Sequence, residues 1–356
     1  MKPVKKCLLV VAIIFIVLFF AGMIAIPKIM FPDYEEPVVT GAHTVEMNTF
    51  TWEDESRIET FTDTGENRAL TVKFWYPKEE GTYPLIVFSH GAFGVIDSNY
   101  STCMELASNG YVVASIAHPY HAAFVEDANG KVTIGDMNFV QQVYEDNGEY
   151  SEEGEKRTYE KCKEWMALRT ADMNFVLDTI LAKVQKKEDF FVKIDSDKIG
   201  LFGHSMGGAT SVQLGRERDD IDAVIDLEGT MMGEYVDFKD GYEVYNDEPY
   251  PIPVLDVNSE AVSKQAKELD EEHPNWEYVN YYLGRNAVDY REIIFKNAGH
   301  LNFTDLPLIS PALAKLLGVG EVDAKECIEN VNEVVLTYFD YYLKGEGSLS
   351  ELQETY

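Results

Sequence analysis

Basic residues are scarce in this chain of 356 residues, which has 30 Lys and Arg against 62 Asp and Glu. The formal net charge of −32 leaves no cationic footprint that could neutralise phosphates, so we expect no nucleic-acid partner. The same balance excludes docking on anionic lipid through charge alone. An excess of acidic residues is instead typical of a solubilising surface.

Cysteine is scarce too, and the four residues are Cys7, Cys103, Cys162 and Cys327. Their spacing fits no metal-binding motif, and Cys7 stands apart near the N-terminus, so the odd remainder forms no disulfide framework. Free buried thiols are the main expectation, with a Cys103–Cys162 bridge as the alternative. The chain also lacks internal repeats and low-complexity segments. No metal or cofactor is implied.

One long apolar run is present, from Leu8 to Ile26, and lysines precede it. As a helix this run would be roughly 28 Å long, close to the hydrocarbon thickness of a bilayer. It is longer than the core of a usual signal peptide, and Ala21 and Ala25 have the wrong spacing for cleavage. We therefore expect a transmembrane anchor at 7–27, with residues 1–6 in the cytoplasm and the rest outside. A secreted protein whose signal peptide is cleaved is the alternative.

After the anchor, the proline-punctuated residues 28–44 suit a short stalk. From about Val45, short apolar runs alternate with longer amphipathic stretches. Strands are predicted at 70–77, 84–91, 111–119, 197–203, 222–229, 252–260 and 289–299, and helices at 100–109, 165–187, 207–216, 263–283 and 327–343. This alternation predicts an α/β fold at 45–345, with a mostly parallel central sheet flanked by helices and a tail at 346–356.

The stretch 121–164 interrupts the alternation, because it is polar and acidic and has no clear strand. An insertion at this point would lie beside the strand ends where the active site of such a sheet opens. It is either a lid over that site or a solvated surface excursion.

The stretch Gly203-His204-Ser205-Met206-Gly207 fits the pattern G-x-S-x-G. The pattern alone is weak, but here a predicted strand precedes it and a predicted helix follows, as in a nucleophile elbow. An elbow strains the backbone of its serine, so it needs small residues two positions to either side, and Gly203 and Gly207 supply them. Ser205 is therefore the candidate nucleophile, a plain strand-to-helix turn is the alternative, and His204 is expected to point away from the serine.

An oxyanion hole needs backbone N–H groups directed at developing negative charge. The Met206 N–H begins the elbow helix, and the Ala92 N–H lies in the loop after the strand at 84–91, so these two are the candidate donors. His90, at the end of that strand, is interpreted as a residue that fixes the loop. His300 follows an apolar strand and a short turn, and it is the candidate base.

The acid that orients His300 has several candidates. The segment VIDLEGT offers Asp226 and Glu228, and the segment VLDVNSE offers Asp256 and Glu260. Within a strand Asp226 and Glu228 share one face, but Glu228 lies nearer to the edge where chemistry occurs. Position therefore favours Glu228, and the other three remain alternatives.

Four motifs, FSHGAFG, GHSMGGAT, LEGTMM and GHLNFTD, together resemble the plasma and intracellular type II platelet-activating factor acetylhydrolases. Members of this family are α/β-hydrolases that cleave short or oxidised sn-2 acyl chains from phospholipids without calcium. The resemblance covers about residues 70 to 305. It implies Ser205 as nucleophile, His300 as base and a small-molecule or lipid ester as substrate, and it places Glu228 where the family has an aspartate.

Two departures from the family pattern bear on the substrate. The glutamate is one methylene longer than the aspartate, and the tryptophan-methionine-aromatic-proline run of the family is absent after Glu228. Similar elbows occur in dienelactone hydrolases, chlorophyllase-like esterases and polyester hydrolases. The alternatives are therefore a general esterase of those kinds, a peptidase or thioesterase, or a catalytically silent binding domain.

Overall fold

The computed structural model describes residues 27–146, 152–272 and 277–356. The predicted anchor at 7–27 lies outside these ranges apart from Pro27, and so do the predicted cytoplasmic residues 1–6. Over the described ranges, no helix is both long enough and apolar enough to cross a membrane.

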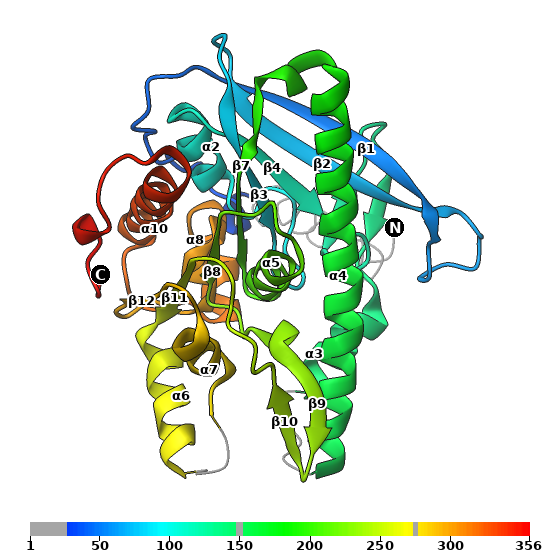
Figure 1. Ribbon diagram of the computed structural model, residues 1–356, viewed down its shortest axis with the longest axis vertical. Coiled ribbons are helices and arrows are strands. Elements are labelled where there is room, and N and C mark those ends of the chain that lie inside the picture. Colours follow the sequence, from blue (N-terminus) through cyan, green and yellow to red (C-terminus); the bar gives the residue numbers. More distant parts are fainter. Residues whose placement is uncertain (1–26, 147–151, 273–276) are drawn as a thin grey trace, which may run out of the picture.

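Within these ranges, eight strands form one sheet in the order β1-β2-β4-β3-β7-β8-β11-β12 (Figure 1). The strands are β1 (Val45–Ile58), β2 (Asn67–Pro77), β3 (Tyr83–Ser89), β4 (Val112–Ala117), β7 (Ile194–His204), β8 (Ala223–Leu227), β11 (Val254–Ser259) and β12 (Tyr290–Phe295). β2 pairs antiparallel with β1 and with β4, and the remaining pairs are parallel. The predicted α/β class with a mostly parallel sheet is confirmed.

Helices flank this sheet. They are α2 (Tyr100–Ser108), α3 (Met137–Asp146), α4 (Glu152–Lys186), α5 (Met206–Glu217), α6 (Glu260–Glu272), α7 (Val279–Asn286), α8 (Leu306–Ile309), α9 (Pro311–Leu317) and α10 (Ala324–Phe339). Short 3₁₀ or π turns occur at η1 (Asp189–Lys193), η2 (Met232–Glu234), η3 (His300–Phe303), η4 (Asp340–Lys344) and η5 (Leu349–Glu351). Two small hairpins stand outside the main sheet: β5 (Phe124–Glu126) with β6 (Val132–Ile134), and β9 (Tyr235–Lys239) with β10 (Tyr242–Tyr245).

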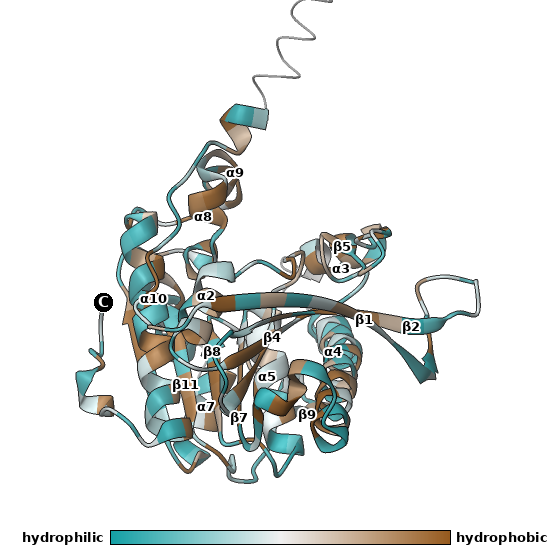
Figure 2. Cartoon of the chain, turned by 90° about the horizontal axis from the view of Figure 1, so that it is seen from above, coloured by the Kyte–Doolittle hydropathy of each residue, from teal (hydrophilic) through white to brown (hydrophobic). Residues whose placement is uncertain are grey.

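The sheet has an apolar core on each face because successive side chains of a strand point to opposite sides. Along β3, Leu85 and Val87 join the core under α4, α5 and α7, whereas Ile86 and Phe88 join the core under α2 and α10. In Figure 2 the strands β4, β7 and β11 carry the apolar colour between these helical layers. Burial on both faces explains why these strands are nearly continuous apolar runs.

The stretch 121–164 carries the β5–β6 hairpin, α3 and the beginning of α4. The helix predicted from Trp165 begins instead at Glu152, so α4 runs along almost the whole length of the molecule beside α5 (Figure 1). Its first turn contains Glu152, Glu153 and Glu155, whose negative charges interact favourably with the positive end of the helix dipole. The polar composition of this segment therefore reflects an exposed helix start.

The predicted stalk at 28–44 lies against the folded domain. The His43 N–H donates to Ser108 O at 3.0 Å, and the Ser310 hydroxyl, between α8 and α9, donates to Met30 O. The segment that follows the predicted anchor is thus attached at both of its ends.

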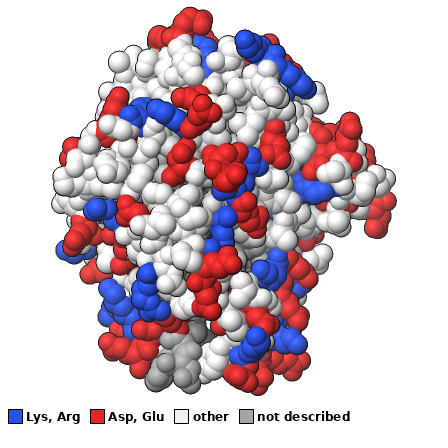
Figure 3. Space-filling model, in the orientation of Figure 1, with Lys and Arg blue, Asp and Glu red and all other residues white. Residues whose placement is uncertain are grey.

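The acidic charge is spread over the surface. On the face in Figure 3, Asp and Glu side chains are scattered with Lys and Arg between them, and they form no single patch. This distribution agrees with a solubilising role for the excess charge.

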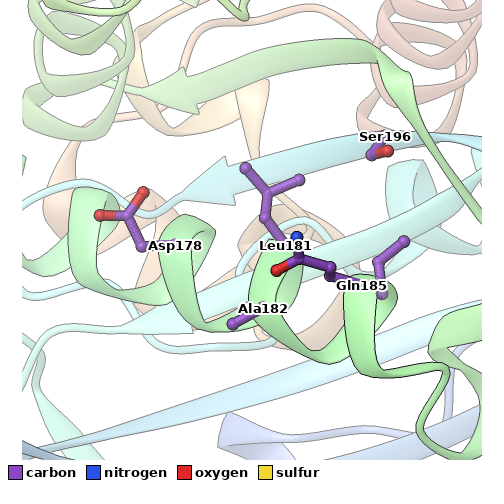
Figure 4. Close-up of a pocket in the computed structure, with 6 residues that line it drawn as sticks. Asp178, Leu181, Ala182, Gln185 and Ser196 are labelled. Carbon is purple, nitrogen blue, oxygen red and sulfur yellow. The ribbon is translucent and has the colours of Figure 1, made fainter.

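A shallow groove of about 570 Å³ lies between α4 and the start of β7 (Figure 4). Its lining includes Leu181 and Gln185 of α4 and Ser196 of β7. Ser196 is near the beginning of β7 and the elbow is at its end, so this groove lies far from the candidate nucleophile.

Candidate active site

Ser205 lies at the turn between β7 and α5 and has φ 55° and ψ −127°. A positive φ is rare for a residue other than glycine, and here the Ser205 N–H is held by Leu227 O at 2.8 Å. A Cβ atom on Gly203 would lie 2.2 Å from the Gly207 carbonyl group, and one on Gly207 would lie 1.9 Å from Ser89 O. Both predicted elbow glycines are therefore required by close backbone packing.

His300 begins η3, just after β12, and its position is tied to the elbow. The imidazole of His204 donates from Nε2 to His300 O at 2.9 Å, and the two rings are 4.5 Å apart. Burial, and then the neighbouring His300, lower the pKa of His204 to about 3, so His204 is a neutral donor. The sequence gives no sign of this contact, which joins the residue next to Ser205 to the backbone of the candidate base.

Glu228 lies directly after β8 and also has a positive φ, of 54°. Its Oε2 lies 2.7 Å from Nδ1 of His300, and its Oε1 accepts from the Ser259 N–H at 2.8 Å. The Glu228 side chain is 3% exposed and that of His300 is 45% exposed. The carboxylate is thus shielded from water, whereas the imidazole can meet a substrate.

The alternative acids lie elsewhere. Asp226 is fully buried within β8, and its Oδ1 accepts from the Gly229 N–H at 2.8 Å. It is in register with Asp256 of β11, and burial together with this second carboxyl raises the pKa of Asp226 well above its usual range. Asp256 accepts from Tyr290 and Asn280, and Glu260 is exposed at the start of α6. Of the four candidates, the structure brings Glu228 to His300.

The candidate oxyanion donors border the elbow. Gly91 lies so close to it that a Cβ there would be 3.1 Å from the Cβ of Ser205. Ala92 follows Gly91 in the chain, and Met206 is the first residue of α5, where an N–H has no partner within the helix. An ester carbonyl at Ser205 would therefore have these two N–H groups nearby.

His90 is fully buried beside this loop, as expected for a residue that fixes it. Its Nδ1 donates to Gly91 O at 2.7 Å, and its Nε2 accepts from the His118 N–H at 3.2 Å. Burial and then Arg169 lower the pKa of His90 well below its usual value, which keeps this imidazole neutral.

An apolar cluster covers the elbow on the side of α3 and α4. Its buried members are Phe139, Cys162, Trp165, Met166, Met206 and Ala209, with Ala92, Phe93, Val143, Met232 and Tyr235 packed against them. Cys103, Cys162 and Cys327 are buried thiols that form no disulfide among the described residues, which confirms the main expectation for them. The cluster joins the segment 121–164 to both residues that carry the candidate oxyanion donors.

Comparison with known proteins identifies a family. The profile of a family described as "Platelet-activating factor acetylhydrolase, isoform II" matches residues 57–350. A platelet-activating factor acetylhydrolase from Cavia porcellus is 25% identical over 272 residues, covering 73% of this chain and 58% of that protein. One from Bos taurus is 26% identical over 281 residues, covering 73% and 57%. The chain thus spans less than two thirds of the length of these relatives.

A solved structure shares the fold. A ferulic acid esterase from Streptomyces cinnamoneus superimposes with a TM-score of 0.65 at 22% identity, covering 88% of this chain and 94% of that one. At this identity the likeness concerns the fold alone.

Proposed function

Because the chain belongs to the platelet-activating factor acetylhydrolase isoform II family, we propose that it is a serine hydrolase of esters with Ser205, His300 and Glu228 as its catalytic triad. The observation that carries this assignment is the 2.7 Å contact between Glu228 Oε2 and His300 Nδ1, with His300 held by His204, the residue before the elbow serine. A carboxylate on Nδ1 holds the proton there and leaves Nε2 free to act as a base.

The proposed reaction is acyl transfer in two steps. Ser205 Oγ attacks the ester carbonyl while His300 takes its proton, and Glu228 stabilises the imidazolium that forms. The N–H groups of Ala92 and Met206 stabilise the oxyanion of the tetrahedral intermediate. The intermediate collapses to an acyl-enzyme, and the leaving alcohol takes the proton from the imidazolium. Water then repeats the sequence and releases the acid.

For the substrate we propose an ester with a short or modified acyl chain, including phospholipids with such a chain at sn-2. The family membership supports a lipid ester, and the apolar cluster at the elbow supports an acyl group of limited size, because Phe139 and Trp165 fill the space beside Met206. An aromatic ester, the kind of substrate named for the fold neighbour, serves as a comparison substrate in the test.

The test uses the full chain in detergent and its Ser205→Ala variant. Both are assayed on p-nitrophenyl esters from acetate to dodecanoate, on methyl ferulate and on a phospholipid with an sn-2 acetyl group. We expect Ser205-dependent turnover limited to short chains, with the phospholipid cleaved. Turnover of simple esters or methyl ferulate alone would instead indicate a general esterase, and no turnover would indicate a silent binding domain.

We also propose that residues 7–27 tether the enzyme to a membrane, with the catalytic domain outside the cytoplasm. The apolar run from Leu8 to Ile26 supports this proposal, and so does the attachment of Met30 to Ser310 beside α9, where Leu316 and Leu317 are exposed. A tethered enzyme should cleave vesicle lipid faster than a variant lacking residues 1–26 does. Equal rates for the two, or recovery of the intact chain in the soluble fraction, would contradict the tether.

A further inference from the structure

The loop that carries Ala92 is held from α4. Arg169 is fully buried, and its guanidinium donates from Nη1 to His90 O at 2.6 Å and from Nη2 to Gly91 O at 3.3 Å. Its Nε donates to Nδ1 of His121 at 3.3 Å. One side chain of the long helix therefore contacts two consecutive carbonyl groups of the loop and the imidazole behind it.

These contacts determine where the Ala92 N–H points. The Gly91 carbonyl and the Ala92 N–H belong to the same peptide group, which is planar and trans, so the two bonds point in opposite directions. Gly91 O also accepts from His90 Nδ1 at 2.7 Å and from the Gly94 N–H at 3.1 Å. Because these donors fix the direction of the Gly91 carbonyl oxygen, the Ala92 N–H must point in the opposite direction. They also polarise the peptide, which strengthens the N–H as a donor.

A second set of contacts anchors the start of the same loop. Asp172, three residues after Arg169 on α4, lies 3.0 Å from Nδ1 of His118, and Nε2 of His118 lies 2.9 Å from Ser89 Oγ. The Ser-His-Asp order resembles a triad, but all three side chains are fully buried, so no substrate reaches them. Burial and then Arg169 lower the pKa of His118 to about 4, so it is a neutral link between β3 and α4.

The buried positive charge of Arg169 is not balanced by any carboxylate of the described ranges in direct contact with it. Burial opposes ionisation of Asp172, but Arg68, with bonds of 2.7 Å from Nε and Nη2, holds the pKa of that carboxyl well below its usual range. Within the part of the chain that the structure describes, no carboxylate forms an ion pair with Arg169. Burial lowers the pKa of Arg169 to about 9 although the charge of Asp172 opposes this shift, so a guanidinium with only neutral hydrogen-bond acceptors is costly here. Its N–H groups hold two carbonyl oxygens of the loop and Nδ1 of His121.

We propose that Arg169 is a positioning residue, which holds the Gly91 carbonyl so that the Ala92 N–H faces the reacting ester. The inference rests on the function proposed above, with Ser205 as nucleophile. Arg169 touches no substrate, and its effect is on the transition state, where the oxyanion forms, more than on the bound ester.

The experiment compares the full-length protein with Arg169→Lys and Arg169→Met. Lysine keeps the charge but is shorter and lacks the planar fork of the guanidinium, so it cannot reproduce the three directed contacts of Arg169, and methionine removes the donors while keeping much of the volume. Arg218→Lys is the matched control, because Arg218 also joins α4 through Asn174 and Asp178 but has no contact with the loop. Thermal melting identifies which variants are folded.

Three quantities are measured for each folded variant: kcat/KM for p-nitrophenyl acetate, Ki for a trifluoromethyl ketone that forms a tetrahedral adduct, and Kd for an unreactive amide analogue. Removal of an oxyanion donor costs about 10²–10³-fold, and misdirecting one should cost less, about 10-fold to 100-fold. We expect kcat/KM to fall and Ki to rise by the same factor in both Arg169 variants. We expect the Kd for the amide to change by less than about 3-fold, and Arg218→Lys to resemble the wild type.

Other results overturn the inference. A folded Arg169→Lys with wild-type kcat/KM would show that the loop does not need the guanidinium. Parallel changes in kcat/KM and in Kd for the amide would indicate a general loss of the pocket. Turnover that persists in Ser205→Ala would instead refute the proposed function, and this inference with it.

Discussion

Replacing Glu228 with glutamine is the sharpest perturbation of the candidate triad. The new side chain has nearly the same shape, and its oxygen can still accept from the Ser259 N–H, as Oε1 of Glu228 does at 2.8 Å. Its NH₂ group would then face Nδ1 of His300, where a carboxylate oxygen now lies at 2.7 Å. Two donors cannot share that contact, so the imidazole must carry its proton on Nε2, where it cannot act as a base.

The size of the effect follows from this distance. Opposite unit charges 2.7 Å apart attract by roughly 6 kcal/mol at an effective dielectric constant of about 20. Because the His300 side chain is 45% exposed, solvent screening reduces this attraction, and we take about 4 kcal/mol as its contribution to the transition state. Since each 1.36 kcal/mol is a factor of ten, kcat should fall about 10³-fold.

The assay is kcat for p-nitrophenyl acetate, with Asp226→Asn as the matched control. Both variants replace a buried acidic side chain by its amide, two residues apart in the chain. The Asp226→Asn side chain keeps an oxygen for the Gly229 N–H, which Asp226 binds at 2.8 Å, so we expect activity within about 3-fold of the wild type. Loss of activity in Asp226→Asn with Glu228→Gln unaffected would refute the reasoning and assign the acid to Asp226.

Three further outcomes are expected. Ester hydrolysis should be faster at high pH than at low pH, because a histidine base acts only in its neutral form, and a flat profile from pH 5 to 8 would argue against His300 as the base. Burial raises the pKa of Asp305 from 3.8 to about 7. The folded chain therefore binds more protons than the unfolded chain between these values, and its stability should fall by up to about 4 kcal/mol as pH rises from 4 to 7. In Asp305→Asn, the free energy of unfolding measured with urea should fall less between pH 4 and pH 7. An unchanged fall would contradict the raised pKa of Asp305. Gly203→Ala should lower the free energy of unfolding by at least about 2 kcal/mol, because its Cβ would lie 2.2 Å from the Gly207 carbonyl group; an unchanged melting temperature would show that the elbow can relax.

The apolar strands could be predicted from the sequence because burial on both faces makes them continuous hydrophobic runs. The strand β1 has no continuous apolar run and could not be predicted in this way. Along β1 polar residues alternate with residues such as Phe50 and Trp52, which pack against the core. The helix predicted at 263–283 is in fact two helices, α6 and α7, on either side of residues 273–276, which lie outside the described ranges.

The elbow and the candidate base could be predicted because local spacing reveals both: glycines two positions from Ser205, and a turn before His300. The contacts of Arg169 and Asp172 could not be predicted from the sequence. On an amphipathic helix these residues are expected on the solvated side, and only the fold shows that Arg169 contacts the loop after β3 and that Asp172 contacts His118, after β4. The acid could not be chosen from the sequence, because four carboxylates lie in or just after two neighbouring strands. In the structure Glu228, directly after β8 and with a positive φ, contacts His300.

The central claim is that Ser205 is the nucleophile, and covalent labelling tests it most directly. The full-length protein is treated with a fluorophosphonate, digested and analysed by mass spectrometry beside its Ser205→Ala variant, with ester turnover measured on the same samples. We predict one adduct, on the peptide that contains Ser205, and loss of both the adduct and the turnover in Ser205→Ala. An adduct on another residue, or turnover that persists in Ser205→Ala, would contradict the account.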